Sequence, residues 1–484
     1  MDSEKSRGAQ IHPKGAGNHL TEGPIISSML ALALPIIFAN ILQTMYQLID
    51  TFWVGRLGAN AIAAVSLSFP ILFLIISIGG GLAIAGTILV AHHKGGGRQH
   101  SINYVSAQTF LMMVLVSIPL SIIGYFASPY LIKLMGADAA VFTGAVSYLQ
   151  ISFAGLVFVF GYFVFQSLMR GVGDVKTPIY VVLGTVALNY VLDPLFIMGY
   201  GPIPAYGVAG AAIATVITQG LAAIIGLWML FSGKYGIHLN LKNLAPDYSV
   251  IKRIFALGVP ASLEQSSQAL GMAVMTFLVA SFGTEVVAMY GIGGRIISFV
   301  IIPAIGFSIA TSTLVSQNIG AGKKDRAREI TKKGAIMAFL ILTFAGIIIF
   351  IFAKPLAALF IPGDIAVIEG SALFVRITAL TFGFIGVQQV LAGAFRGWGD
   401  TFIPMILAIF ALWVLRFPLA YVLSKHTALA ASGIWWAFPV ANVVAGVAAV
   451  LWYRSGSWRE SKLNENFRMR EEVIEEAIAD EGVQ

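Results

Sequence analysis

The chain has 484 residues, of which 58% are hydrophobic and 11% charged, with a formal net charge of +7 and no cysteine. Soluble proteins are about 25% charged, whereas repeated apolar runs of about twenty residues match a bilayer core about 30 Å thick. This composition excludes a soluble protein, and the lack of cysteine excludes thiol chemistry and cysteine-based metal sites. No motif combines basic and aromatic residues, so nucleic acid is not an expected partner.

Polar segments flank the apolar part of the chain. Residues 1–24 lack the short apolar core and small-residue cleavage site of a signal peptide. We therefore expect a disordered tail over residues 1–24. A second charged tail is expected over residues 454–484, which are rich in Glu and Arg.

Twelve apolar segments lie between the tails, and each is long enough to cross a bilayer as a helix. Barrel strands would instead alternate over about ten residues, so the segments predict helices. The predicted spans are 25–54, 59–91, 101–128, 138–169, 177–199, 206–232, 250–281, 284–317, 329–353, 367–395, 401–424 and 430–453.

The distribution of Lys and Arg predicts the orientation of these spans, because positive residues concentrate in cytoplasmic loops. Most of the 30 Lys and Arg residues, Arg170 and Arg396 among them, fall in segments on the side of the two tails. Only four fall in loops on the opposite side, namely Arg56, Lys133, Lys354 and Lys425. We expect a multi-pass protein of the plasma membrane with both termini in the cytoplasm.

The second half of the chain repeats the first. A shift of 225 residues aligns Pro35 with Pro260 and Gln43 with Gln268, and a similar shift aligns the stretches 170–174 and 396–400, which share the pattern Arg-Gly-x-Gly-Asp. We predict an all-α protein with two pseudo-symmetric six-helix lobes, 25–232 and 250–453, joined by a linker at 233–249. Each lobe has an even number of spans, so the repeat is parallel and two such lobes can enclose a cleft that opens alternately to either side. A static channel or scaffold is the alternative.

Charged and polar residues inside the spans mark candidate functional sites, since a charge at the bilayer centre costs about 2.5–3.5 kcal/mol on insertion scales. Gln43, Tyr46, Gln47 and Asp50 lie three or four residues apart, on one face of the first span. Asn189 and Asp193 share a face of the fifth span, and Thr215 lies in the sixth. Such an oxygen-rich set suits a hard cation or a shared proton. Alternatively, each Asp forms a hydrogen bond to a neighbouring helix.

The two halves differ at these positions. Met275 stands at the repeat position of Asp50, and the segment around the counterpart of Asp193 contains Arg416 and no carboxylate. We therefore expect the cation or proton that binds these oxygen atoms to have its ligands in the first lobe only.

Two further residues leave alternatives open. Pro35 removes a backbone hydrogen bond from the first span, so it predicts either a hinge or a static kink that Pro260 repeats. Glu264 shares a face of the seventh span with Gln268. Glu264 either pairs with Arg295 or Arg416, as a structural group, or belongs to a second coupling or substrate site.

Enzymatic motifs are absent or weak. The segment 171–174 matches the Gly-x-Gly-Asp pattern of intramembrane aspartyl proteases, but its recurrence at 397–400 favours a turn. The chain has no phosphate-binding loop and no HExxH motif. We expect no enzyme activity and no cofactor.

The chain resembles the multidrug and toxic compound extrusion (MATE) family over about residues 25–453. The resemblance depends on the twelve spans, the parallel repeat, the stretch Asp-Thr-Phe-Trp-Val-Gly-Arg-Leu-Gly from Asp50, the Arg-Gly-x-Gly-Asp loops and the pattern Asn189-x-x-x-Asp193-Pro194. It implies efflux of cationic or amphipathic compounds, driven by inward flow of H⁺ or Na⁺.

The resemblance also implies residue roles. Asp50 and Asp193 would be the coupling carboxylates, Asn189 and Thr215 would complete a cation site that holds Na⁺ in a sodium-coupled protein, and Pro35 would be the bend point of the first helix. The expected substrate cavity is lined by Gln43, Tyr46, Gln47, Tyr148, Glu264 and Gln268. One branch of the family has an acidic residue where this chain has Gln268, which argues against a cation site in the second lobe.

We expect a monomeric antiporter for small cationic or amphipathic compounds, embedded in the lipid bilayer. The alternative is a related flippase for lipid-linked oligosaccharide or polysaccharide units. Such flippases usually have a more basic cavity, whereas only Arg295 and Arg416 are available here.

Overall fold

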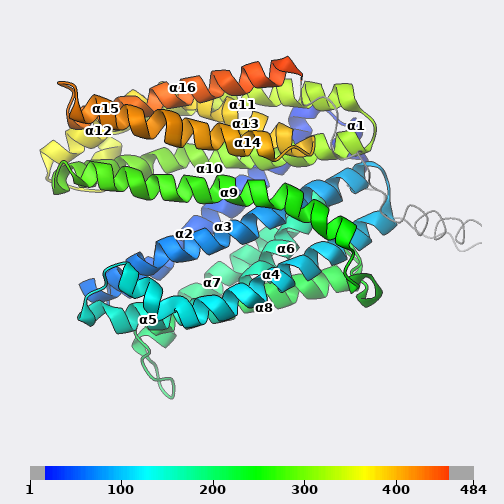
Figure 1. Cartoon of the computed structure of the whole chain (residues 1–484), viewed down its shortest axis with the longest axis horizontal. Helices are drawn as coiled ribbons and strands as arrows, with labels where there is room; N and C mark the ends of the chain where they lie inside the picture. The colour runs from blue at the N-terminus through cyan, green and yellow to red at the C-terminus, as the bar shows by residue number, and fades with distance from the viewer. Residues whose placement is uncertain (1–16, 457–484) are drawn as a thin grey trace, which may run out of the picture.

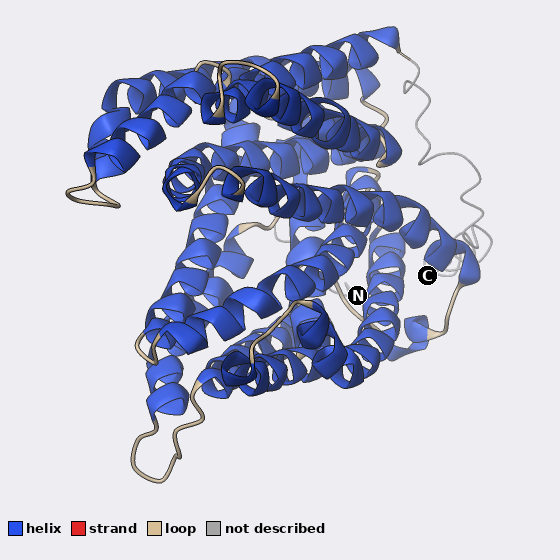
Figure 2. Ribbon diagram, turned by 60° about the vertical axis from the view of Figure 1, so that its left-hand side comes forward, coloured by secondary structure: helices blue, strands red, loops and turns tan. Residues whose placement is uncertain are grey.

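A computed structural model describes residues 17–456, and the element bounds are those of this structure. Helices, turns and loops make up this part of the chain, in which no strand forms (Figure 2). The expectation of an all-α fold is therefore confirmed for the described residues. The charged tail expected from residue 454 lies almost entirely outside them.

The helices form two groups that lie side by side (Figure 1). The N-terminal lobe contains α2 (Ile25–Gly55), α3 (Ala59–Gly95), α4 (Gln99–Leu134), α5 (Ala139–Ala154), α6 (Leu156–Val172), α7 (Lys176–Met198) and α8 (Val208–Ser232). The C-terminal lobe contains α9 (Tyr248–Ala280), α10 (Thr284–Gly320), α11 (Lys324–Ala358), α12 (Ile365–Ala379), α13 (Phe382–Gly397), α14 (Phe402–Ile409), the π-helical turn η2 (Phe410–Arg416), α15 (Phe417–Lys425) and α16 (Ala431–Ser455).

The twelve predicted spans each correspond to a helix or to a run of consecutive helices. Among residues 17–456, nine segments are long and apolar enough to cross a membrane, and two bent pairs raise this number to eleven. The one remaining predicted span, which corresponds to α9, is less apolar because the polar run 264–268 interrupts it. The two-lobe arrangement of twelve spans that the repeat predicts is confirmed.

The bent pairs are a feature that apolar segments cannot predict. Helices α5 and α6 meet at an angle of 48°, and their counterparts α12 and α13 meet at 54°. The first bend falls at Gly155, where an added Cβ would overlap Val216 of α8. The bend therefore brings the α5–α6 junction against α8 at a distance that only glycine permits.

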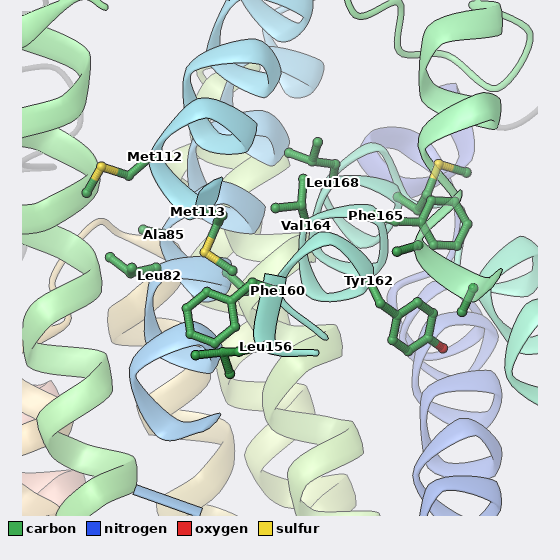
Figure 3. Packing of buried hydrophobic residues seen from close by; sticks show 14 of the residues in the cluster. Leu82, Ala85, Met112, Met113, Leu156, Phe160, Tyr162, Val164, Phe165 and Leu168 are labelled. Atoms are coloured by element: carbon green, nitrogen blue, oxygen red, sulfur yellow. The ribbon is translucent and has the colours of Figure 1, made fainter. Parts of the chain in front are cut away.

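Large apolar side chains fill the interior of the N-terminal lobe (Figure 3). Met112 and Met113 of α4 and Phe160 and Phe165 of α6 are buried in one cluster with the second half of α3. Burial of such a side chain contributes about 1.5–3 kcal/mol to stability. This packing holds the helices that carry the polar residues of the lobe in fixed positions.

Helix α2 belongs to both lobes. Its first half, from Ile25 to Ile36, packs in a cluster with α10, α11 and α13 of the C-terminal lobe. Its second half packs with the N-terminal lobe, where Tyr46 and Val54 are buried. Helix α2 is therefore a mechanical link between the lobes.

The lobes meet tightly at one end, which we call the closed end and define by Gly95, Gly96 and Gly320. An added Cβ on Gly95 would overlap the carbonyl oxygen of Gln317, and one on Gly320 would overlap that of His92. The backbones of α3 and α10 are therefore in direct contact there. Gln317 also donates a hydrogen bond of 2.9 Å from Nε2 to the carbonyl oxygen of Gly171, across the two lobes.

A short helix, α1 (Gly17–Glu22), lies against the closed end. Asn318 of α10 donates a hydrogen bond of 3.2 Å to the carbonyl oxygen of Leu20, whose side chain is buried. Lys323 and Arg326 donate to the carbonyl oxygens of Thr21 and Gly23. The expectation of disorder over residues 1–24 is therefore wrong for Gly17–Glu22, because these contacts fold the segment.

The linker between the lobes is tied to α4. Gln108 donates hydrogen bonds of 2.7 Å to the carbonyl oxygens of Asn243 and Ala245. Asp247 caps α9 by accepting from the backbone amides of Ser249 and Val250, and it accepts from the Tyr104 hydroxyl at 2.7 Å. Partial burial acts to raise the pKa of Asp247, but the hydrogen bonds from Ser249 and Tyr104 outweigh it and lower this pKa below its ordinary value.

Candidate functional site

Two carboxylates lie inside the N-terminal lobe, one on each of two neighbouring helices. Asp50 is on the second half of α2 and is 9% exposed, and Asp193 is on α7 and is fully buried. Helices α2 and α7 pack along each other, and the two carboxylates lie within range of mutual electrostatic interaction. The structure thus brings together the two acids that the sequence selected from distant segments.

Hydroxyl and amide groups surround this pair. Asn189, one helical turn from Asp193, donates a hydrogen bond of 2.8 Å from Nδ2 to Asp193 Oδ1. The Tyr46 hydroxyl lies 2.6 Å from the Thr218 hydroxyl on α8, and both side chains are buried. Tyr148 of α5 is also buried, and both carboxylates act on it electrostatically. The site therefore draws residues from α2, α5, α7 and α8.

Several oxygen atoms of this site have no hydrogen-bond partner among the described residues. They are Asp50 Oδ1, Asp193 Oδ2 and Asn189 Oδ1, and all three are buried. A buried acceptor without a partner costs about 1–3 kcal/mol, and more when it is charged. Three such acceptors on one pair of helices are the arrangement expected where a proton or a metal cation binds.

The donor set fits a small hard cation better than a transition metal. No cluster of three or more His, Asp or Glu side chains with metal-ligand geometry occurs in residues 17–456. Carboxylate and amide oxygens are the ligands that a small hard cation prefers, and a proton needs only one carboxylate.

The remaining predicted residues differ in exposure. Gln43 is half-buried and Gln47 is exposed, although both lie on α2 near Tyr46 and Asp50. Thr215 is half-buried and interacts with the Tyr46 hydroxyl. The structure does not test the roles expected for these residues as cavity lining or cation ligand.

Two polar residues of α8 were missed by the sequence interpretation. Thr218 forms the hydrogen bond to Tyr46, and the buried Gln219 has an Oε1 atom without a partner in the described chain. They follow Thr215 by three and four residues, so the helical spacing that grouped the residues of α2 could have found them.

Glu264 has a different partner from those expected. Its Oε1 lies 2.5 Å from the guanidinium of Arg396 on α13, and the two residues are 4% and 8% exposed. Arg396 also donates to the Ser308 hydroxyl at 3.3 Å. The predicted pairing of Glu264 with Arg295 or Arg416 was therefore wrong. Arg396, which the sequence placed in a loop, is buried in the last turn of α13. Gln268, one turn along α9, is exposed.

Pro35 lies at the point where α2 passes from one lobe to the other. The residues before it pack with the C-terminal lobe, and those from Leu42 onward pack with the N-terminal lobe. The helix continues through Pro35 without a break. Pro35 also lines an outer groove of about 740 Å³ between the first turns of α2 and Lys176.

The model of the MatE family matches residues 35–195 and 260–422. The two matched segments begin at Pro35 and Pro260, the prolines that the internal repeat aligns, and together they cover more than half of the chain. This chain belongs to the MatE family. The family resemblance that the sequence motifs indicated is confirmed. The names of its relatives are those of drug-resistance proteins and transporters, not of enzymes.

Curated relatives and solved structures support this assignment. Similar proteins include the probable multidrug resistance protein YpnP of Bacillus subtilis, 32% identical over 92% of this chain and 98% of the relative. Another is the probable multidrug resistance protein YoeA of Bacillus subtilis, 29% identical over 90% of this chain and 95% of the relative. A solved structure described as the outward-facing conformation of a multidrug resistance MATE family transporter is 26% identical, with a TM-score of 0.85, and covers 93% of this chain and 99% of that chain. The chain is thus a multi-pass membrane transporter.

Proposed function

We propose that this member of the MatE family is a secondary antiporter that exports cationic or amphipathic compounds in exchange for H⁺ or Na⁺. The observation that supports this most directly is the set of unpartnered oxygens on Asp50, Asp193 and Asn189. Two relatives are named probable multidrug resistance proteins, which supports efflux of drugs.

Helix α2 supplies the coupling between ion binding and lobe movement. Binding a proton or Na⁺ at Asp50 and Asp193 removes negative charge from the N-terminal lobe and weakens its attraction for a cationic compound. Because the first half of α2 packs with the C-terminal lobe, a rearrangement at Asp50 acts through Pro35 on the contacts between the lobes. The effects are reciprocal, so the bound compound weakens ion binding by the same factor.

The proposed orientation follows from the Lys and Arg distribution. With both termini in the cytoplasm, the closed end would face the cytoplasm, and we propose that this arrangement is an outward-facing state of a monomeric transporter in the plasma membrane. Flippases of this kind usually have a more basic cavity, whereas the buried carboxylates of the N-terminal lobe favour cationic cargo.

The test is transport by the purified protein in sealed lipid vesicles. A pH gradient or a sodium gradient is imposed alone, and the movement of a cationic fluorescent dye is followed. We expect one gradient to drive dye against its concentration and the other to have no effect. Dye movement that neither gradient accelerates would contradict antiport.

A further inference from the structure

The outer groove beside the first half of α2 lies apart from the candidate functional site. Its volume of about 740 Å³ falls within the range of about 300–1,000 Å³ that is typical of small-molecule sites. The exposed face of α2 as far as Pro35 lines the groove, together with Lys176 in the first turn of α7. Lys176 is the one charged residue among those that line it.

The face that α2 contributes to the groove is apolar and points away from the protein interior. Ile26 is 52% exposed and Leu34 is 58% exposed, and the half-buried Leu30 lies between them at the spacing of one helical turn. Phe38, which is 48% exposed, continues the same row beyond the groove. The opposite face of this part of α2 is buried in the cluster shared with the C-terminal lobe. A row of large apolar side chains on the outside of a membrane-spanning helix is a surface for lipid chains.

Lys176 lies level with the start of α2. Gly173, three residues earlier, is so close to Leu20 that an added Cβ would lie 2.7 Å from the Leu20 Cδ1 atom, and Val175 is buried in the same cluster as Leu20. The ammonium group is therefore at the end of the groove where α2 begins. From its first residue to Pro35, α2 rises about 15 Å, which is half of a bilayer core about 30 Å thick. The groove thus has the length of one lipid leaflet.

The charge of Lys176 has no partner among residues 17–456, where its ammonium group forms no ion pair and no hydrogen bond. Asp174, the nearest acid along the chain, accepts hydrogen bonds of 3.1 and 3.0 Å from the backbone amides of Lys176 and Thr177. It also accepts one of 2.6 Å from the Thr177 hydroxyl. The Asp174 carboxylate is thus engaged by the first turn of α7. A free ammonium group at the end of an apolar groove is complementary to an anionic headgroup that carries an acyl chain.

A second cation lies at the same end of the groove. Arg326 of α11 donates a hydrogen bond to the carbonyl oxygen of Gly23, next to Pro24 in the groove lining. The Nε atom of Arg326 has no hydrogen-bond partner in the described part of the chain. Glu22, the acid closest to this lining along α1 and α2, pairs with Lys323 at 3.4 Å. The mouth of the groove is therefore positively charged, which favours the phosphate of an anionic lipid.

We propose that the groove binds one anionic phospholipid, with its phosphate at Lys176 and an acyl chain along the exposed face of α2 as far as Pro35. The assignment of this lipid to the cytoplasmic leaflet rests on the proposed orientation, whereas the site itself does not depend on antiport. A lipid chain beside Pro35 contacts α2 at the proposed hinge. The anionic lipid content of the membrane would therefore act on the same step as the hinge.

The chain has no cysteine, so a single fluorescent label can be placed beside the groove. Phe38→Cys carries a bimane label one turn beyond Leu34 without filling the groove. Leu340→Cys on α11, at a side chain that is 60% exposed, carries the same label on another outer surface. Each labelled full chain is reconstituted in vesicles with a fixed ratio of phosphatidylglycerol to phosphatidylcholine, and bromine on the acyl chains of one lipid or the other quenches the label.

Quenching gives the affinity of each position for phosphatidylglycerol relative to phosphatidylcholine. A basic residue near the membrane surface favours an anionic lipid about fivefold. We therefore expect a relative affinity of about five at Phe38→Cys and of about one at Leu340→Cys. Equal quenching by the two lipids at Phe38→Cys, or the same preference at both positions, overturns the proposed site.

Four further substitutions in the Phe38→Cys protein separate a bound lipid from general attraction to a positive surface. Lys176→Gln removes the charge, Lys176→Arg keeps it, and Ala31→Trp fills the groove while Lys176 stays in place. Lys252→Gln, at an exposed lysine near the start of α9, is the matched control. We expect Lys176→Gln and Ala31→Trp to lower the relative affinity below about two, and Lys176→Arg and Lys252→Gln to preserve it.

Several results would overturn the lipid site. They are a preference that survives Lys176→Gln or Ala31→Trp, one that Lys252→Gln lowers equally, and one that Lys176→Arg lowers as far as Lys176→Gln does. None of these results affects the antiporter proposal, which dye flux in sealed vesicles tests separately.

Discussion

At the scale of single residues, few charged side chains are buried, and they differ in whether an oppositely charged side chain lies beside them. Glu264 forms an ion pair with Arg396, although its Oε2 has no hydrogen-bond partner, whereas neither Asp50 nor Asp193 has a cationic partner in the described part of the chain. Stability alone does not favour the second arrangement, because an uncompensated buried charge costs several kcal/mol. The unpaired acids are therefore the residues on which transport is expected to depend.

Removal of either unpaired acid should stop transport without unfolding the protein. Asp50→Asn and Asp193→Asn preserve the size of the side chain but cannot exchange a proton or balance a cation. We expect dye efflux from cells that express either variant to fall to the level of cells without the protein, with expression unchanged. Asp325→Asn, at a carboxylate that is 96% exposed, is the matched control. Efflux at the wild-type rate from both buried variants would disprove the site.

Glu264 should matter more to stability than to ion coupling. Glu264→Ala leaves the buried Arg396 without its counter-charge, which typically costs about 3–5 kcal/mol, so we expect a clear fall in the melting temperature in detergent. Glu369→Ala breaks an exposed ion pair with Lys354 and should cost less than about 1 kcal/mol. Glu264→Gln keeps an acceptor for Arg396 and should retain more efflux than Asp193→Asn. A stable but inactive Glu264→Gln variant would show that coupling is not confined to the N-terminal lobe.

Sequence spacing predicted part of the site. The helical spacing of Tyr46 and Asp50, and of Asn189 and Asp193, placed each pair on one face, and the structure brings both faces together. The partner of Glu264 was not predictable in this way, because Arg396 is 132 residues away along the chain and its position next to a turn motif indicated solvent. Long-range pairing between helices depends on packing that a single sequence does not specify.

At the scale of elements, α2 is the helix whose two halves belong to different lobes. Pro35 lies at the junction, where a missing backbone hydrogen bond lowers the resistance of the helix to bending. Pro35→Ala restores that hydrogen bond and stiffens the connection.

We expect Pro35→Ala to reduce the maximal transport rate severalfold while the affinity for dye changes little. The measurement is dye binding in detergent compared with dye flux in vesicles. Pro119→Ala is the control, because Pro119 lies within α4, which does not cross between lobes in this way. Weaker dye binding with an unchanged maximal flux would argue against a hinge.

The start of α9 should be sensitive to acid through its cap. The hydrogen bonds to Asp247 lower its pKa in the folded protein, so its contribution to stability is complete above the ordinary carboxyl pKa of about 4. This contribution is lost as the pH falls through the lower pKa of the folded state. We expect the difference in melting temperature between wild type and Asp247→Asn to shrink as the pH falls below about 4. A difference that does not depend on pH would mean that the carboxylate charge is not what stabilises the cap.

The positions of the spans followed from hydropathy, and their bends did not. Apolar runs predicted all twelve segments to within a few residues, since a bilayer imposes a minimum length. Hydropathy did not predict the bends between α5 and α6 at Gly155 and between α12 and α13 near Leu380, because a bent helix is as apolar as a straight one. Helix α1 was hidden for the opposite reason, since its sequence is polar and it folds through backbone contacts to α10 and α11.

At the scale of the whole molecule, the backbone contact of α3 and α10 at the closed end should set the balance between the two states of the transporter. Gly320→Ala adds a Cβ that would overlap the His92 carbonyl, so it should force the lobes apart there. Gly291→Ala on the same helix meets no atom within 4 Å and serves as the control.

The chain has no cysteine, so a pair of spin labels can be introduced at Gln99→Cys and Lys324→Cys, at the start of α4 and α11. We expect Gly320→Ala to shift the distance distribution between these labels to longer values, and Gly291→Ala to leave it unchanged. An unchanged distribution in both would mean that the helices absorb the added methyl group without moving apart.

The contact between Gly95 and Gly320 also bears on how the membrane keeps its ion gradients while the transporter works. Protons cross proteins along files of water molecules, and two backbones in van der Waals contact leave no width for such a file. Most of the contact there is between backbones, and the Gln317 side chain has to release its hydrogen bond to Gly171 when the lobes part. The barrier to leakage can thus be removed and restored in each cycle with little repacking of side chains. A single methyl group at Gly320 would then be expected to make the membrane leaky to protons before it impaired folding.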